Sequence, residues 1–411
     1  MFDCTRKQQT YVLGNVNVLD GKGNKLMGVD IEVDNGHIKN IHNQGWNNQG
    51  LPLYDLNGFW VMPGMIDMHV HLCSETPEQN TPRAQWRMTT PPPLKVLSAA
   101  SNCGHVTYYE PEDVALGEAV RNGTIVGPRI IASAGGVTMT AGHGDLCFPS
   151  TVLRLPEYRY GEACADGVSE CMKRVREKVR NGADFIKIFS SGGCSSHGDE
   201  PHWPNFTLEE TKAIVETAHA LERKVASHTQ GESGAEIAIQ AGVDTIEHGC
   251  SLTEEMCQMM AEKGIFLVPT VKVLRALCKK KSPHMRLKAE TLIKKHMKAI
   301  EYAKKAGVKM AFGTDTSGFT LLHGENADEL VYLSQCGISN KDLIIMATSR
   351  AAEALGMEEE IGSVEEGKAA DLLIIDTNPE DDITVLTSSQ HLKGIIRDGH
   401  FIKADIPNVP C

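Results

Sequence analysis

Histidines and an aspartate stand at the ends of several apolar runs in this sequence. The first run closes with Asp67-Met68-His69-Val70-His71, and three later runs close with His228, His248 and Asp315. Residues two apart on a strand face the same side, so His69 and His71 can project together. Such a pair suits two imidazoles on one metal ion, while two hydrogen-bonded histidines near a strand end are the alternative.

Lys187 is the second unusual residue, because it lies inside the apolar run Phe185-Ile186-Lys187-Ile188-Phe189. A strand of this composition is typically covered on both faces, and a bare ammonium there is costly to desolvate. Burial lowers the pKa of a lysine, and a neutral amine can react with carbon dioxide to give a carbamate. A carbamate is an anionic oxygen ligand that can bridge two metals. The alternative is a lysine that extends to solvent or pairs with an acid.

Two further histidines are candidates for contacts with a substrate. His143 lies between two glycines after the third run, and His323 follows the eighth run in Leu322-His323-Gly324. An imidazole at either position could donate to the carbonyl oxygen or the carboxylate of a substrate, or be an ordinary loop residue. Residues 195–200 are interpreted as a mobile substrate loop, and His197 within it is not assigned to a metal.

These side chains need a scaffold that brings strand ends together. Eight apolar, β-branched runs alternate with helical patterns, at residues 65–70, 105–108, 129–132, 184–189, 224–227, 244–247, 265–269 and 309–312. Helices are predicted at 208–223, 286–306 and 339–355. Thr207 and Glu210 form a capping-box pattern, and Gly307 and Gly356 occupy C-cap positions. We therefore predict an α/β fold with a (β/α)8 TIM-like barrel over residues 63–356.

The carboxyl ends of all strands in such a barrel meet at one rim. Five metal-type side chains would therefore converge there, namely His69, His71, His228, His248 and Asp315. Each one alone could be an ordinary loop residue, but five together predict a metal site.

Short strands with turn signals are predicted at both ends of the chain, at residues 11–18, 28–33, 37–41, 371–376 and 392–398. Since they flank the barrel, residues 1–62 and 357–411 are expected to pair into one small β-sandwich domain.

Composition excludes several classes of partner. Among 411 residues, 41 Lys and Arg stand against 53 Asp and Glu, so the formal charge is −12 without a basic stripe. This balance argues against nucleic acid or an anionic membrane as partner and favours a small molecule. The first nineteen residues lack an apolar core of a signal peptide, and no apolar run of about 18 residues could span a bilayer. The 12 cysteines contain no close CxxC pair, so we expect reduced thiols in a cytoplasmic protein.

The motifs together resemble the amidohydrolase superfamily, in its binuclear-metal carboxypeptidase-like branch, which includes prolidase-type dipeptidases and ochratoxinase. The resemblance covers nearly the whole chain. It rests on Val61-Met62-Pro63-Gly64-Met65-Ile66-Asp67-Met68-His69-Val70-His71, Ala141-Gly142-His143-Gly144-Asp145, Ser227-His228-Thr229-Gln230-Gly231, Ile246-Glu247-His248-Gly249 and Phe312-Gly313-Thr314-Asp315.

The resemblance implies a distribution of ligands between two divalent metal ions. His69, His71 and Asp315 would bind the first metal and His228 and His248 the second. Lys187, carboxylated on its side-chain nitrogen, would bridge them. Zinc is the expected metal, although members of the family differ in the metal they use.

The implied reaction is hydrolysis of the amide bond to a C-terminal amino acid, as in a carboxypeptidase, a dipeptidase or an N-acyl-amino-acid hydrolase, including ochratoxin-type amides. Two cations sharing a water generate a bridging hydroxide near neutrality and polarise the carbonyl. Asp315 would accept the proton and then deliver it to the departing amine. His143, at the rim of the barrel, would donate a hydrogen bond to the carbonyl oxygen or the carboxylate of the substrate.

One departure concerns the second strand. The branch usually ends this strand with Thr-Val-Arg-Asp, whereas this chain has His105-Val106-Thr107-Tyr108-Tyr109-Glu110. A substrate contact made by that arginine would be absent or replaced, so the reaction class is better defined than the range of substrates.

Two other functions compete with this reading. A cyclic-amide hydrolase resembling imidazolonepropionase would bind one metal and lack a bridging lysine. A non-catalytic barrel kept for assembly, as in dihydropyrimidinase-related scaffold proteins, typically loses ligands, whereas all six positions are present here. By resemblance, a homo-oligomer is expected.

Overall fold

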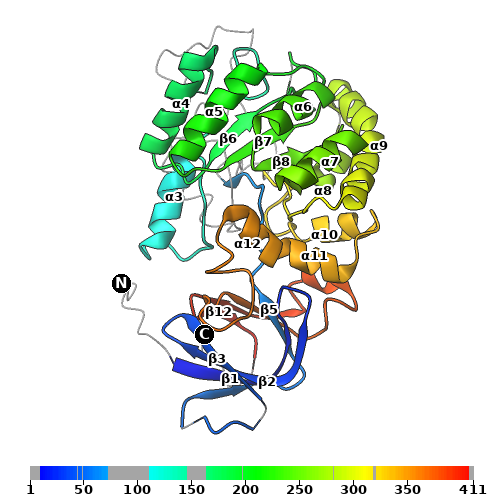
Figure 1. Cartoon of the computed structure of the whole chain (residues 1–411). Helices are drawn as coiled ribbons and strands as arrows, with labels where there is room; N and C mark the ends of the chain where they lie inside the picture. The colour runs from blue at the N-terminus through cyan, green and yellow to red at the C-terminus, as the bar shows by residue number, and fades with distance from the viewer. Residues whose placement is uncertain are drawn as a thin grey trace. The chain divides into compact units, whose positions relative to one another are not determined.

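The computed structural model describes residues 10–43, 45–48, 50–72, 111–145, 163–196, 198–280, 282–317 and 321–406 (Figure 1). The chain divides into two compact units. One combines Met1–Ile66 with Leu330–Cys411, and the other is Asp67–Glu329. The first unit is therefore assembled from both ends of the chain.

An eight-stranded sheet is the main element of the unit built from the termini. Its strands are β1 (Thr10–Leu19), β2 (Lys25–Asp34), β3 (His37–Asn43), β4 (Leu53–Asp55), β5 (Trp60–Pro63), β10 (Leu372–Ile375), β11 (Leu392–Arg397) and β12 (His400–Ala404). They follow the order β12-β11-β10-β5-β1-β2-β3, with β4 beside β1. The antiparallel pair β5–β10 joins the two chain ends, which confirms that they pair into one β domain.

The sheet is continuous, which differs from the two separate sheets of the predicted sandwich. Its curvature brings strands that are distant in the sheet order together, since the ring centroids of Tyr11 and Phe401 lie 5.4 Å apart. Tyr54 packs edge-on against both rings. The Tyr11 hydroxyl donates to the main-chain oxygen of Gly399 at 2.9 Å. One sheet thus covers both sides of its own apolar core.

Two helices replace the single helix predicted at residues 339–355. They are α11 (Asn340–Ala347) and α12 (Ser349–Leu355), separated by Thr348 with φ −129° and ψ −100°. The hydroxyl of Thr348 donates to the oxygens of Ile344 and Gly21, which fixes the break. Gly356 ends α12 in the left-handed conformation, as its sequence position predicted.

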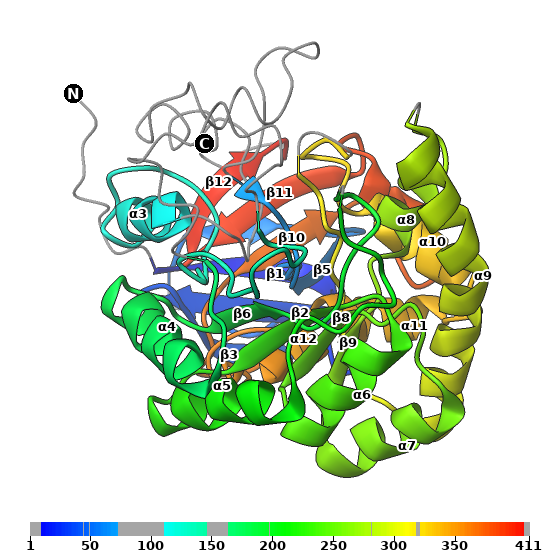
Figure 2. The same ribbon diagram turned by 90° about the horizontal axis from the view of Figure 1, so that it is seen from above.

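The unit Asp67–Glu329 contains a parallel sheet of β6 (Ile186–Phe189), β7 (Val225–Thr229), β8 (Thr245–His248) and β9 (Phe266–Val268) in sequence order. Figure 2 shows these strands side by side, with α5 (Leu208–Ala220) and α6 (Glu232–Ala241) lying against them. All residues of β6 and β8 are buried, which agrees with their uninterrupted apolar runs.

Parallel bridges extend this sheet in both directions. Val137 pairs with Ile188, Leu267 with Met310, and Val70 with Thr316. Seven of the eight predicted runs, or residues next to them, are therefore hydrogen-bonded each to the next along the sheet. The run at 105–108 lies outside the described residues, so a closed ring is not seen among those that are described. The runs at 65–70, 129–132 and 309–312 form no regular strand within the described residues.

Helix ends follow local chemistry. The remaining helices of this unit are α3 (Pro111–Arg121), α4 (Val168–Arg180), α7 (Glu254–Lys263), α8 (Val271–Leu277) and α9 (Pro283–Ala306), and α10 (Asp328–Ser334) leads into the other unit. The capping box of Thr207 and Glu210 is confirmed at α5. That helix ends at Ala220, three residues before the predicted end. Gly307 ends α9 in the left-handed conformation.

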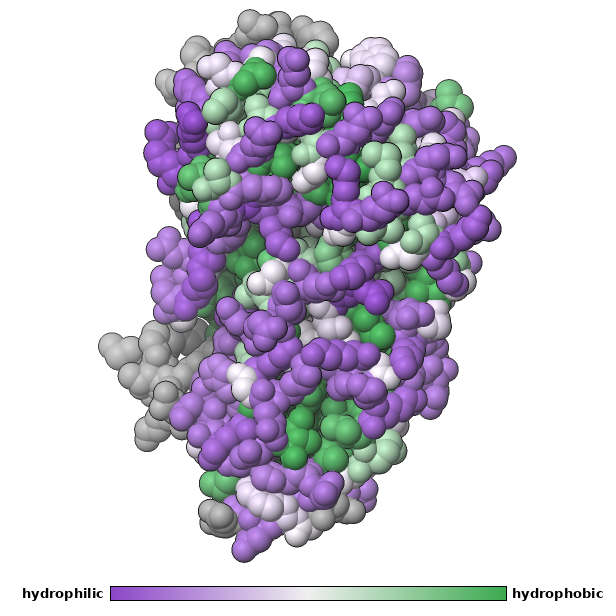
Figure 3. All heavy atoms as spheres, viewed as in Figure 1, coloured by the Kyte–Doolittle hydropathy of each residue, from purple (hydrophilic) through white to green (hydrophobic). Residues whose placement is uncertain are grey.

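None of the described helices combines the length and apolar character needed to cross a membrane. Figure 3 shows a mostly hydrophilic face with scattered hydrophobic side chains. The seven cysteines whose state the structure describes are free thiols, in line with the predicted reduced state.

Candidate active site

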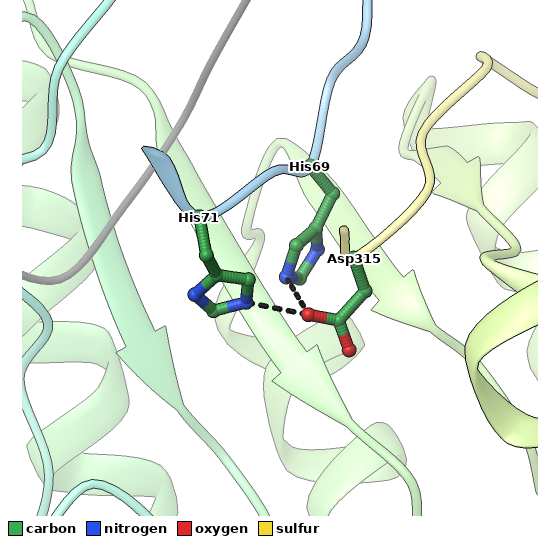
Figure 4. A group of neighbouring side chains, drawn as sticks. All are labelled: His69, His71 and Asp315. Carbon is green, nitrogen blue, oxygen red and sulfur yellow. Dashed lines mark ion pairs between the residues drawn. The ribbon is translucent and has the colours of Figure 1, made fainter. Parts of the chain in front are cut away.

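His69, His71 and Asp315 form a compact cluster at the ends of the first and eighth runs (Figure 4). One ligand atom from each lies within 4.8 Å of the other two. Asp315 Oδ1 is 2.5 Å from His71 Nε2 and 3.7 Å from His69 Nε2. Two imidazole nitrogens and one carboxylate oxygen therefore point at a common position, which is a donor set that zinc favours.

Main-chain geometry brings Asp315 to the two histidines. Asp315 adopts a left-handed conformation with φ 57°, which is uncommon for a residue with a side chain. Its N–H donates to the oxygen of His69 at 2.6 Å. Strained backbone of this kind persists only where the surroundings hold it, and it concentrates at functional sites.

His228 and His248 lie near the carboxyl ends of β7 and β8, where they form a second group. His248 Nε2 is 2.9 Å from His228 Nδ1, and the ring centroids of His248 and His69 are 4.9 Å apart. His248 is also left-handed, with φ 69°. The structure thus brings all five predicted rim residues together.

His228 and His248 have the properties expected of metal ligands. His228 Nε2 is buried and has no hydrogen-bond partner among the described residues. Burial, and then neighbouring cationic groups, lower the pKa values of His228 and His248 well below the usual range. Both rings are therefore neutral near pH 7, which is the form of histidine that ligates a metal.

Lys187 is buried in the middle of β6, with 4% of its surface exposed, so it does not extend to solvent. Desolvation lowers the pKa of its amine, against the opposing effect of Glu247 and Asp315. Its nitrogen has no hydrogen bond within the described part of the chain. In the parallel pair β6–β7, Phe189 lies beside His228. Lys187 precedes Phe189 by two residues, so both side chains lie on the same face of β6. Burial thus favours the neutral form of the amine beside the histidines, which is the form that carboxylation requires.

Asp315 is anionic in these surroundings. Burial alone would raise the pKa of its carboxyl, but His71, His69 and Lys187 outweigh burial and lower it to about 2. The site therefore offers the Asp315 carboxylate beside the imidazoles, with the buried carboxylate of Glu247 against His69. Cations held there would need more negative charge, which a carbamate on Lys187 would supply.

Glu247 is a site residue that the sequence reading missed. It accepts from His69 Nδ1 at 2.8 Å, which directs His69 Nε2 toward Asp315. Orientation of a ligand histidine by a carboxylate is a usual feature of metal sites. In the parallel pair β7–β8, Glu247 lies beside His228. The sequence alone could not predict this neighbour, because it depends on the register of the two strands.

His143 lies beside the second group, stacked on His228 with ring centroids 4.3 Å apart. Its Nδ1 is 2.7 Å from Ser196 Oγ and 3.2 Å from Asp199 Oδ2. Its Nε2 has no hydrogen bond among the described residues and is available to a ligand. A Cβ at Gly193 would overlap the imidazole, so the glycine there permits this close approach.

Asp199 was not predicted either, although it anchors His143. It is buried and accepts from Gly193 N at 2.9 Å and from the Ser196 hydroxyl. The buried Lys288 donates to its main-chain oxygen at 2.5 Å. Burial alone would raise the pKa of the Asp199 carboxyl. Its hydrogen bonds and the charge of His143 outweigh burial, so the pKa lies below its usual range. The loop carrying Asp199 is thus held by a helix far along the chain.

His323 faces the backbone of the first cluster, and its predicted substrate contact stays a prediction. Its Nε2 lies 3.2 Å from the main-chain oxygen of His71, so this nitrogen supports the backbone of the first cluster. His197 and the Tyr108-Tyr109-Glu110 segment lie outside the described residues.

Known proteins resemble this chain in sequence and in fold. The sequence matches the amidohydrolase family over residues 60–402. Ochratoxinase of Aspergillus niger is 32% identical over 368 residues, which cover 84% of this chain and 75% of that protein. A Xaa-Pro dipeptidase crystallised with methionine in its active site is 30% identical, with a TM-score of 0.85 over 97% of this chain and 100% of that one. A prolidase complexed with N-methylphosphonate-L-proline is 29% identical, with a TM-score of 0.88 over 96% of this chain and 100% of that one.

Proposed function

Since this chain belongs to the amidohydrolase family, as its motifs predicted, we propose that it hydrolyses amide bonds to a C-terminal amino acid. The observation that carries the proposal is the convergence of five metal-type side chains beside a buried lysine. The names of the similar proteins, ochratoxinase, Xaa-Pro dipeptidase and prolidase, support an amide substrate with a free carboxylate.

In this proposal the chain holds two divalent cations. His69, His71 and Asp315 would hold one, and His228 and His248 would hold the other. A carbamate, formed when the neutral Lys187 Nζ bonds to the carbon of CO2 and releases a proton to solvent, would add anionic oxygen ligands for these cations. When bound, the metals supply Lewis acidity and lower the pKa of water.

Asp315 carries the proton transfers. Its carboxylate is anionic at neutral pH, so it can accept a proton from the attacking water. The same proton then passes to the amide nitrogen as the C–N bond breaks, which releases the amine as a neutral leaving group. A serine or cysteine nucleophile has no part in this scheme.

His143 binds the substrate in this proposal. Asp199 and Ser196 occupy its Nδ1 side, which leaves Nε2 to meet the carbonyl oxygen or the carboxylate of the substrate. A substrate contact by His323 stays a prediction, since its Nε2 faces the His71 carbonyl.

We also propose that the chain has the complete fold predicted from the sequence. Residues 105–108 would supply the second strand and close the (β/α)8 barrel over residues 63–356, with residues 1–62 and 357–411 as the β domain. Zinc as the native metal, a cytoplasmic location and a homo-oligomeric state also stay predictions, which metal analysis, fractionation and light scattering would measure.

Imidazolonepropionase-type hydrolysis of a cyclic amide is the second candidate. It requires one metal and no bridging lysine, so the number of metals per chain separates the two. A non-catalytic barrel is disfavoured because the described ligand set is intact.

The test combines metal analysis with a substrate panel. The metal-loaded protein is assayed against dipeptides, Xaa-Pro among them, and against N-acyl amino acids, each paired with its C-terminal amide as a matched control. We expect two metals per chain and cleavage of the free acids in preference to the capped forms. One metal per chain, or no cleavage of any free acid, would contradict the proposal.

A further inference from the structure

The segment from His323 to Glu329 contacts the supports of both histidine groups. Asn326 Nδ2 donates to Asp67 Oδ2 at 2.7 Å. Glu329 accepts from the N–H groups of Val271 and Lys272, at 2.6 Å each. His323 adds its contact with the His71 carbonyl. Seven consecutive residues therefore reach the segment that carries His69 and the loop beside His248.

The first contact ties the two backbones that present His69 and Asp315. Asp67 Oδ1 accepts from the N–H groups of His69 and Thr314, both at 3.1 Å. Asp67 Oδ2 accepts from Thr314 Oγ1 and from Asn326, both at 2.7 Å. Since Asp67 is buried, each donor it loses costs free energy. Of these four donors among the described residues, Asn326 is the one from outside the segments that carry His69 and Asp315.

The second contact supports an uncommon backbone beside His248. Thr270 has φ 52° and ψ 52°, a left-handed conformation that is costly for a β-branched residue. Its hydroxyl lies 2.6 Å from His248 Nδ1, on the side of the ring opposite His228. Thr270 makes no side-chain cap to α8, and Glu329 takes the first two N–H groups of that helix instead. Glu329 thus holds the start of α8 where Thr270 must turn.

Lys272 completes this second contact. Its ammonium donates to the Glu325 oxygen at 2.7 Å and to Asp328 Oδ2 at 2.9 Å. The start of α8 is therefore bound to the segment through both its backbone and a buried cation.

We propose that the segment His323–Glu329 is a positioning element with two separable arms, and this inference rests on the proposed function. The Asn326–Asp67 arm sets the affinity of the His69, His71 and Asp315 group for its metal. The Glu329–Thr270 arm sets the affinity of the group that contains His248.

The test is a Zn²⁺ titration of the metal-free full-length protein in competition with a chelating dye. We expect Asn326→Ala and Thr270→Val each to weaken one of two zinc equivalents by about 10- to 100-fold, the usual cost of losing an orienting partner. Thr270→Ser keeps the hydroxyl and should bind like the wild type.

Matched controls are available elsewhere in the chain. Asn340→Ala removes an amide that donates to the Glu380 oxygen at 3.0 Å, and Thr211→Val removes a buried hydroxyl that donates to the Thr207 oxygen at 2.9 Å. Neither should change zinc affinity. Thermal unfolding of the metal-free variants reports folding, and Asn326→Gln replaces Asn326→Ala if the latter does not fold.

The two arms can be tested separately in a protein that already carries His248→Ala. There, Asn326→Ala should still weaken the remaining zinc, whereas Thr270→Val should have no further effect. Unchanged affinity in folded Asn326→Ala and Thr270→Val proteins would overturn the inference and leave the proposed function intact. A further loss with Thr270→Val in this background would overturn the route through His248. A wild type that binds no zinc would instead overturn the proposed function and the inference with it.

Discussion

The buried carboxyl of Glu329 makes a quantitative prediction about pH. Burial, and to a smaller extent the charge of Asp67, raise the pKa of Glu329 from an ordinary 4.5 to about 8, although the N–H groups of Lys272 and Val271 oppose the shift. Between these values the unfolded chain loses the proton and the folded chain keeps it. Ionisation therefore favours the unfolded state, and the free energy of unfolding falls as pH rises through this window.

The magnitude follows from the size of the shift. A difference of about 3.5 pKa units corresponds to about 5 kcal/mol in total, of which about 3.5 kcal/mol falls between pH 5 and pH 8. Glu329→Gln cannot ionise and lacks this loss. Relative to the wild type, the variant should gain about 3.5 kcal/mol of stability over the same interval. The hydrogen bond altered by the amide adds an offset that does not vary with pH.

Urea unfolding of metal-free protein at pH 5, 6, 7 and 8 measures the difference. Glu365→Gln is the control, because salt bridges and hydrogen bonds from Lys22, Ser363 and Lys368 outweigh burial and lower the pKa of Glu365 to about 2. Its contribution to stability is lost only as pH falls below 4.5 toward 2, so its difference from the wild type should stay constant from pH 5 to 8. Parallel stability curves for Glu329→Gln and the wild type would refute the reasoning about a neutral buried acid.

Three other outcomes are expected. Lys187→Ala should lower hydrolysis of the dipeptide panel by orders of magnitude, with partial recovery on adding short carboxylic acids; full activity in the variant would rule out the bridging carbamate. Asp199→Asn should raise KM for free-acid substrates about tenfold, the cost of one hydrogen bond to a charged group, and steady-state kinetics with an unchanged KM would contradict its anchoring of His143. Gly193→Ala should displace the His143 ring and lower kcat/KM while Zn²⁺ affinity stays unchanged, and a loss of zinc instead would place the effect at the metal ligands.

Several local features were predictable because they depend on neighbouring residues. The capping box at Thr207 and the left-handed glycines that end α9 and α12 lie where the sequence predicts them. The pairing of the chain ends followed from strand patterns at both termini. The break at Thr348 did not, since it depends on a hydrogen bond to Gly21, 327 residues away.

The sequence by itself determined which residue types stand at the strand ends, because the apolar runs and the histidines that close them are contiguous along the chain. It therefore identified the six candidate ligands, and its motifs pointed to the amidohydrolase family. Only the tertiary structure decided how these ligands are oriented. Glu247 holds His69 across 178 positions, and Asn326 holds Asp67 across 259. Such partners are set by strand register and by left-handed turns at His248, Thr270 and Asp315. These features arise from packing between distant segments, which no local pattern encodes.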